Sequence, residues 1–384
     1  MIHVNKSARS HFRGDIGDYL KVFACVAVMG QPIIGLLIHS QSPHLQTNLG
    51  SIYNLIKYTA PAFIFGILYT DIRQHSELGY FDVRAYYRNI GVSLFLPTII
   101  WSLIYLLIMP DLQQRFRWHN TLTFLWQFIN GNAAPHLWYN TMMLQFAILV
   151  PLFWQLHLWL GQNAWKGWAV LIGTAVLYLV WLGIYNSYVF HQPGETHWYL
   201  TDRLFISFIL YAIYGVLAWN YRRQFNHWIF RFWPILLVIL AIAFVKCNHE
   251  LRQYGWPINL VNASYYRPST TIYSLMVIGL VATLSLSNQF HHHLAIQHFF
   301  HYFADLAYQA YLSNVFWEQL LWRGLHLVKF ATMHPYLVLF VLWVATIVLA
   351  FGSAALVQQI IIKLKRRLGK NYQPYEKSRT MNQI

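Results

Sequence analysis

Long apolar runs recur along the whole chain, and the short stretches between them carry most of the polar and charged residues. A helix needs roughly 20 apolar residues to cross a hydrocarbon core about 30 Å thick, and the runs have this length. The pattern predicts an all-α fold, a polytopic bundle of about ten membrane-spanning helices. The predicted spans lie near residues 19–39, 52–70, 90–109, 136–157, 167–186, 204–220, 232–246, 271–287, 303–322 and 336–362.

The composition favours a single domain in lipid. Hydrophobic residues make up 57% of the chain and charged residues only 10%, a balance that would leave large apolar patches on a water-soluble domain. We expect an N-terminal tail at 1–18, a membrane domain at 19–362 and a basic C-terminal tail at 363–384. The tail at 1–18 is polar and leads into a full-length span without a cleavage pattern, so we expect a retained first helix.

The chain has 27 Lys and Arg against 12 Asp and Glu, and their positions decide what this surplus means. If the N-terminus is cytoplasmic, the segments on that side hold twice as many Lys and Arg residues as the segments on the other side. Short basic loops resist translocation, so we expect a multi-pass protein of the cell membrane with both termini in the cytoplasm. The cluster from Lys363 to Lys370 suits anionic lipid headgroups, and we expect a lipid bilayer and no nucleic acid as partner.

Cysteines and histidines indicate no redox or metal site. Cys25 and Cys247 lie in or at the end of predicted spans and imply no disulfide framework. The histidines at 291–293, with His298 and His301, form a cluster on the cytoplasmic side, but the cluster lacks cysteine partners and the ligand spacings of structural zinc sites. We therefore expect no bound metal.

Polar residues inside the spans are informative because each costs free energy there unless it is paired or faces a cavity. In the ninth predicted span, Tyr311, Asn314 and Glu318 lie on one helical face. Glu318 is roughly 22 Å along this helix from its cytoplasmic start. Two interpretations of Glu318 stay open: a site residue, or a structural carboxylate paired with Arg323 or with a neighbouring helix.

The first predicted span also carries polar residues. Lys21 lies at its inner end, Gln31 and Pro32 past its middle, and His39 near its outer end. A lysine at that position commonly extends to the headgroups. Pro32 removes one helical hydrogen bond, which predicts either a packing kink or a small polar spot near Gln31.

Five short segments follow one another in order between about residues 13 and 320. They are Asp18–Ala24, Phe63–Tyr69, Tyr87-Arg88 with Leu96-Pro97, Pro135–Tyr139 followed by Leu144–Phe146, and Leu306–Leu312. This ordered set resembles the acyltransferase-3 family of membrane O-acyltransferases, including the branch that acts in the synthesis of biofilm poly-N-acetylglucosamine. The best match is the sequence Pro-His-Leu-Trp-Tyr at 135–139.

The resemblance implies that the chain takes an acetyl or succinyl group from a cytoplasmic acyl-CoA. It then delivers the group to a hydroxyl of a cell-surface polysaccharide or a lipid-linked sugar. Acyl-CoA is thus the expected donor substrate, and a glycan synthase is a suggested partner. Arg13, Lys21, Arg84 and Arg88 are the expected contacts of the donor phosphates, because cationic side chains bind phosphate well.

The sequence departs from this family at two histidine positions. The family places an arginine and a histidine in the first helix with ten residues between them, and Lys21 and Pro32 stand there in this chain. The late Tyr-Leu-x-His element ends in Asn314 in place of histidine. Lys21 still offers a phosphate a point charge, but Pro32 has no group that can abstract a proton.

Three functions therefore stay open. The first is an active O-acyltransferase with another base, for which Glu318, His136 and His39 are the candidates, and with Tyr311, Asn314 and Trp138 on the acceptor side. The second is a catalytically inactive relative that handles or exports a polysaccharide or a lipid-linked sugar. The third is a small-solute transporter, which ranks last because the spans show no inverted repeat or paired broken helices.

Overall fold

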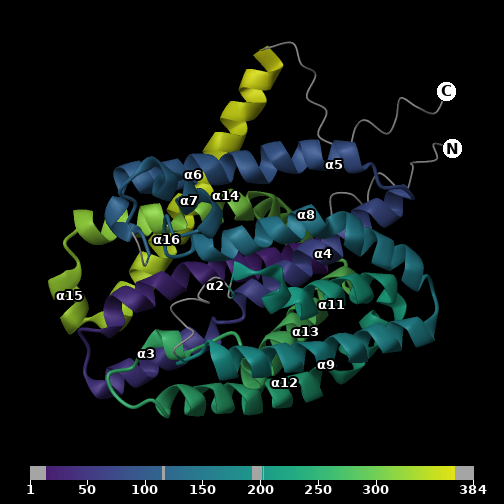
Figure 1. Cartoon of the computed structure of the whole chain (residues 1–384), viewed down its shortest axis with the longest axis horizontal. Coiled ribbons are helices and arrows are strands. Elements are labelled where there is room, and N and C mark those ends of the chain that lie inside the picture. Colours follow the sequence, from purple (N-terminus) through teal and green to yellow (C-terminus); the bar gives the residue numbers. More distant parts are fainter. Residues whose placement is uncertain (1–13, 115–116, 193–200, 202, 368–384) are drawn as a thin grey trace.

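The structure is a computed structural model, and it describes residues 14–114, 117–192, 201 and 203–367. The described residues form helices and connecting loops without a strand, which confirms the predicted all-α fold (Figure 1). The longer helices are α2 (Ile16–Ile38), α3 (Pro43–Leu55), α4 (Thr59–Leu78), α5 (Val83–Ile90), α6 (Leu96–Ile108), α7 (Thr121–Asn130), α8 (Leu137–Leu160), α9 (Ala164–Tyr188), α11 (Ile209–Asn220), α12 (Arg222–Arg252), α13 (Pro268–Phe290), α14 (Leu294–Gly324), α15 (Val328–Met333) and α16 (Pro335–Arg367).

Seven helical segments of the described chain are long and apolar enough to cross a membrane. They comprise α2, the continuous stretch Val83–Ile108, α8, α9, α12, α13 and α16. The remaining three predicted spans fall on α4, on α11 with the short turn before it, and on α14, which carries more polar residues. The structure thus confirms a multi-pass helical bundle, and ten stays an approximate number of crossings.

The second predicted span differs from the structure at its start. Residues 52–70 were expected to form one helix, but α3 ends at Leu55 and α4 begins at Thr59. The turn between them leaves the Ile56 carbonyl oxygen open to a side chain. The Gln31 amide donates to that oxygen (2.9 Å) and to Thr59 Oγ1 (3.0 Å). Gln31 thus has polar partners on a neighbouring segment, and these come from the turn before α4. Average apolar content over 52–70 missed the break, although the polar residues Asn54, Lys57 and Thr59 lie at it.

The third predicted span begins earlier than expected, at Val83 instead of residue 90. Its helix widens into a π-helical turn, η1 (Gly91–Phe95), just before Pro97. Proline lacks the backbone N–H that would continue the regular pattern, and π turns are a common way to absorb such a defect.

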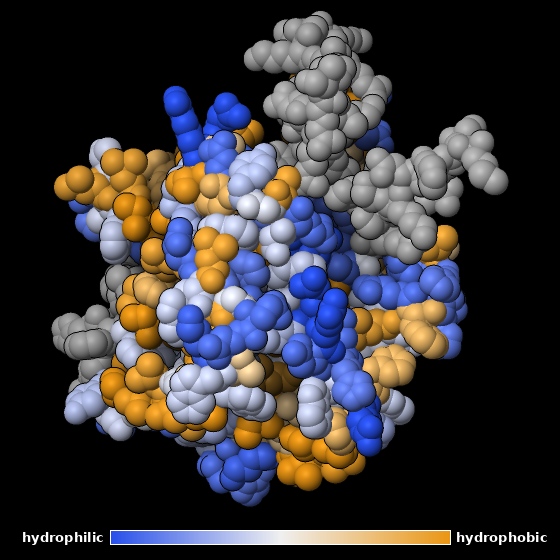
Figure 2. All heavy atoms as spheres, turned by 90° about the vertical axis from the view of Figure 1, so that its right-hand side faces the viewer, coloured by the Kyte–Doolittle hydropathy of each residue, from blue (hydrophilic) through white to orange (hydrophobic). Residues whose placement is uncertain are grey.

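Long helices that follow one another in the chain run in alternating directions between two end faces. Asp15, at the start of α2, pairs with Arg73 near the end of α4, and Tyr19 of α2 contacts Asn288 near the end of α13. We call this end the N face and the opposite end, where α2 ends, the far face. Figure 2 views the molecule from the right-hand side of Figure 1, where the N face lies, and hydrophilic side chains gather in its middle.

Helices α2 and α4 approach each other closely through glycines. A Cβ atom on Gly17 would lie 2.1 Å from Thr70 Oγ1 and 2.8 Å from the Gly66 carbonyl oxygen. Small residues allow such close backbone approach between membrane helices. The contact fixes α2, which carries Lys21 and Pro32, against the centre of the bundle.

Candidate functional site

Helices α2 and α14 run side by side in the same direction. This arrangement brings the two positions where the family has histidine, Pro32 and Asn314, to the same depth in the bundle. Cys25 Sγ of α2 donates to the Ala307 carbonyl of α14 at 3.3 Å. Seven residues further along each helix lie Pro32 and Asn314, about 10 Å beyond this contact. The two positions that lack the expected histidine therefore lie at the same depth in the bundle.

His136 is buried at the start of α8, close to the depth of Pro32 and Asn314. Its Nε2 lies 3.4 Å from the Leu312 carbonyl oxygen of α14. A carbonyl oxygen only accepts hydrogen bonds, so this contact assigns the proton to Nε2 and leaves Nδ1 with a lone pair. Nδ1 is buried and has no hydrogen-bond partner among the described residues. A neutral imidazole with a free lone pair is the form that can act as a base.

Tyrosine side chains hold His136 in place. The Tyr311 hydroxyl donates to the His136 carbonyl oxygen in a short hydrogen bond. The rings of Tyr311 and Tyr105 lie edge-on to the imidazole, with centroids 5.2 and 5.3 Å away. The Tyr105 hydroxyl donates to the Leu312 carbonyl at 2.9 Å, so Tyr105 and Nε2 share one acceptor.

Further polar atoms near this level lack partners. The Tyr139 hydroxyl, both amide atoms of Asn314 and Glu318 Oε2 are buried without a hydrogen bond in the described part of the chain. The Tyr139 and Tyr311 ring centroids are 5.7 Å apart, and Asn314 and Glu318 are neighbours at i, i+4 on α14. A buried polar atom without a partner costs about 1 to 3 kcal/mol, and such atoms cluster at functional sites. We call His136, Tyr139, Tyr311, Asn314 and Glu318 the polar layer.

Glu318 does not pair with Arg323, which was one interpretation of the sequence. Arg323 instead donates to Asp111 in a short ion pair and to Gln319 Oε1 at 3.1 Å. The hydrogen bond from Arg323 lowers the pKa of the Asp111 carboxyl. Glu318 is fully buried, and its Oε1 accepts only a long hydrogen bond of 3.4 Å from the Gln319 amide. The carboxyl thus has no cation beside it within the described residues.

Comparison with known proteins identifies the family. The model of the acyltransferase domain family Acyl_transf_3 matches residues 18–357. The chain belongs to the acyltransferase-3 family. The match runs from α2 to α16 and includes Lys21, Pro32, His136 and Asn314. No curated protein and no solved structure gave a match in the same comparison.

The expected donor contacts of this acyltransferase-3 protein lie at or near the N face. Lys21 Nζ is 3.8 Å from Asp18, whose other carboxylate oxygen lies 2.9 Å from His301 Nδ1. Arg84 and Arg88 are exposed on α5, one turn apart on the same side. Arg13 lies outside the described residues. The structure therefore brings Lys21 into a charged network and leaves Arg84 and Arg88 accessible.

The remaining predicted site residues lie on the far side of the molecule's centre. His39 is exposed at the end of α2, away from the polar layer. Trp138 follows His136 and packs among aromatic rings, 6.1 Å from Tyr139 and 5.9 Å from Tyr265 between centroids. Trp138 thus borders the polar layer, and His39 does not.

Sequence reasoning missed several polar residues near the site. Asn140 donates to Thr98 Oγ1 at 3.0 Å and accepts from the Tyr308 hydroxyl at 2.9 Å, which joins α6, α8 and α14. Lys57 lies in the turn between α3 and α4. A lysine inside the predicted span 52–70 was the available signal, since charges within spans are rare and mark functional sites.

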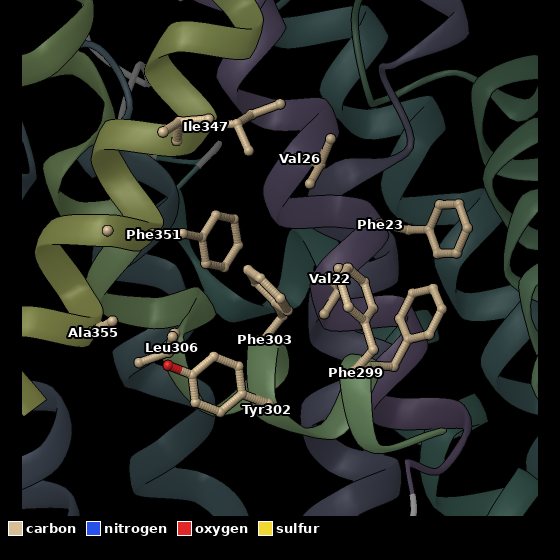
Figure 3. Close-up of a pocket in the computed structure, with 13 residues that line it drawn as sticks. Val22, Phe23, Val26, Phe299, Tyr302, Phe303, Leu306, Ile347, Phe351 and Ala355 are labelled. Carbon is tan, nitrogen blue, oxygen red and sulfur yellow. The ribbon is translucent and has the colours of Figure 1, made fainter. Parts of the chain in front are cut away.

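A groove between α2, α14 and α16 has a different character (Figure 3). Its volume is about 560 Å³, and Val22, Phe303 and Phe351 are among the apolar residues that line it. Tyr302 supplies the one hydroxyl drawn in the close-up. The groove suits a hydrocarbon chain, and its lining offers no base or nucleophile. The described residues also contain no group of three His, Cys, Asp or Glu side chains placed to hold a metal ion.

Proposed function

We propose that this protein transfers an acetyl or succinyl group from acyl-CoA to a hydroxyl of a cell-surface polysaccharide. The observation that carries the proposal is the free lone pair on His136 Nδ1, buried beside the family's altered positions. Family membership supports acyl transfer in general, and the polar layer supplies a base that the sequence motif lacks at Pro32. Acyl-CoA, the polysaccharide acceptor and a glycan synthase partner belong to the proposal.

In the proposed reaction, His136 Nδ1 removes the proton from the acceptor hydroxyl, and the hydroxyl oxygen attacks the thioester carbonyl carbon. A new carbon–oxygen bond forms and the carbon–sulfur bond breaks. The imidazolium then returns the proton to the departing CoA thiolate. The products are an acyl ester and free CoA thiol, so atoms and protons balance without another reactant.

Two unpartnered groups of the layer suit the charge that develops on the thioester oxygen. The Tyr139 hydroxyl and the Asn314 amide both contain N–H or O–H donors without an acceptor in the described structure. Donors that await a developing oxyanion lower the barrier because they need no reorganisation during the reaction. Glu318 is the second candidate base, and the exposed His39 is the third.

The donor is proposed to bind at the N face, with Lys21, Arg84, Arg88 and Arg13 as contacts of the CoA phosphates. The N face is then cytoplasmic, in agreement with the distribution of basic residues. The acceptor sugar is proposed to approach from the far face, where the Trp138 ring borders the layer. Sugar rings stack well on such aromatic faces, and Tyr311 and Asn314 of the layer are the other proposed acceptor contacts.

A second candidate function is a catalytically inactive relative that handles a polysaccharide or a lipid-linked sugar. The observation that favours it is the replacement of both expected histidines, Pro32 and Asn314, at one depth of the bundle. Such a protein would keep the polar layer as a binding site without performing acyl transfer.

Release of free thiol from acetyl-CoA and succinyl-CoA by the protein in liposomes separates the two functions. Thiol release that depends on an amino-sugar oligosaccharide acceptor is the result expected for the enzyme. The absence of release with both donors, together with binding of the oligosaccharide by the same folded preparation, would establish the inactive relative instead.

A further inference from the structure

Lys57 places a positive charge within a predicted membrane span, at a position that neither the family motif nor the proposed donor site uses. It is half-buried in the turn between α3 and α4, within a segment whose sequence predicts a membrane span. Thr59, two residues later, bonds to Gln31, the neighbour of Pro32. Lys57 therefore lies close to the depth at which α2 carries Pro32 and α14 carries Asn314.

Aromatic residues surround the Lys57 ammonium group. Nζ donates to the Tyr53 hydroxyl at 3.0 Å and lies 4.7 Å from the centroid of that ring. On another side, Nζ is 4.2 Å from the ring centroid of Tyr265. Within the described residues no Asp or Glu oxygen lies within 4.0 Å of Nζ. The rings offset part of the cost of burying this charge, but no carboxylate neutralises it.

Contacts through Tyr265 connect Lys57 to the polar layer. The Tyr265 hydroxyl hydrogen-bonds to Thr59 Oγ1 at 3.0 Å, and its ring lies 5.9 Å from that of Trp138. Trp138 in turn lies two residues after His136 in sequence and borders Tyr139. A ligand that reaches His136 along Trp138 therefore passes close to Lys57.

We propose that Lys57 and Tyr53 form a site for an oxyanion, a phosphate or a carboxylate, carried by a substrate of the proposed acyl transfer. An ammonium group has three N–H donors, and one of them is used by Tyr53. The Tyr53 hydroxyl accepts that bond and keeps its own hydrogen for a ligand. Lysine binds such anions as a point charge, and the surrounding rings strengthen the attraction by excluding water.

Two substrate groups carry this chemistry. One is the phosphate of a lipid-linked sugar, and the other is the free carboxylate of a dicarboxylic acyl group such as succinyl. Each anionic ligand can be compared with a similar ligand that lacks the anionic group. A prenyl alcohol replaces a prenyl phosphate, and acetyl-CoA replaces succinyl-CoA. The inference rests on the proposed function for its substrates, but binding is measurable without any turnover.

The test compares binding of farnesyl phosphate with farnesol, and of succinyl-CoA with acetyl-CoA, to the full-length protein in nanodiscs by isothermal titration calorimetry. Wild type is expected to prefer the anionic member of one pair about ten- to hundredfold, which is the range for a charged hydrogen bond. Lys57→Gln should abolish this preference and Lys57→Arg should retain most of it. The pair that shows the effect identifies the substrate group.

Lys246→Gln serves as the matched control, because Lys246 is largely exposed and pairs with Glu250 on its own helix. Equal affinity for both members of each pair in wild type, or a preference that survives in Lys57→Gln, would overturn the inference. A thermal unfolding midpoint of Lys57→Gln close to wild type shows that a lost preference is not unfolding. Failure of acyl transfer alone would leave these binding results intact, so the two proposals fail separately.

Discussion

Replacement of His136 by glutamine tests the proposed base while preserving its structural contact. In His136→Gln, the amide nitrogen of the new side chain can take the place of imidazole Nε2 and donate to the Leu312 carbonyl, which lies 3.4 Å from Nε2 in the structure. The bond from Tyr311 ends on the backbone carbonyl of residue 136, so the substitution does not remove it. What is lost is the lone pair on Nδ1, because an amide nitrogen is not a base at neutral pH.

The expected loss follows from the role of the lone pair. General base catalysis contributes about 100- to 10,000-fold to a rate, which corresponds to roughly 2.7 to 5.4 kcal/mol in the activation barrier. Stability should change much less, because the long bond to Leu312 is of the kind worth about 1 kcal/mol or less and the amide re-forms it. The variant should therefore stay folded and lose kcat, with the KM for acyl-CoA almost unchanged.

Acceptor-dependent thiol release in proteoliposomes measures this loss. Thermal unfolding of the variant and of wild type under identical conditions verifies the fold. His119→Gln is the matched control, since His119 is exposed in the loop before α7. A kcat within about threefold of wild type in His136→Gln would refute the assignment of the base. Activity would then have to depend on Glu318 or His39.

Four further variants test other parts of the structure. Glu318→Gln should keep at least roughly a tenth of the wild-type transfer rate if His136 is the base; a larger loss, with His136→Gln active, would make Glu318 the base. Arg88→Ala should raise the KM for acyl-CoA at low salt, and the difference from wild type should shrink at high ionic strength; an equal KM at every salt concentration would leave Arg88 a topological role alone. Gly17→Ala should lower stability by about 1 to 3 kcal/mol through its clash with α4, whereas Gly183→Ala, with nothing within 4 Å of the added Cβ, should not; equal melting temperatures would contradict the close approach. Asp111→Asn should remove a stabilising contribution that is complete above the ordinary pKa of about 3.9 and is lost as pH falls through the lowered folded pKa; identical acid-unfolding curves for variant and wild type would refute it.

The sequence by itself determined the class of fold and the family. Apolar runs of membrane length leave few alternatives, because only helices satisfy all their backbone hydrogen bonds locally in lipid. The same pattern misplaced the start of two helices, at Thr59 and at Val83. Apolar content marks the part of a helix that lies in lipid, but it does not mark a turn whose carbonyl a side chain such as Gln31 binds, nor a polar helical extension such as Val83–Ile90. Family membership followed from motifs spread along the chain and agrees with the match over 18–357.

Only the tertiary structure decided how the candidate site residues relate to one another. The sequence ranked His136, Glu318 and His39 together, and the fold buries the first two near Asn314 while it leaves His39 exposed. The tautomer of His136 depends on the Leu312 carbonyl, which is 176 residues away in sequence. Lys57 and Tyr265 are likewise joined by contacts between distant segments. A hydrogen bond acts over about 3 Å of space, and sequence spacing reports such proximity only within one helix.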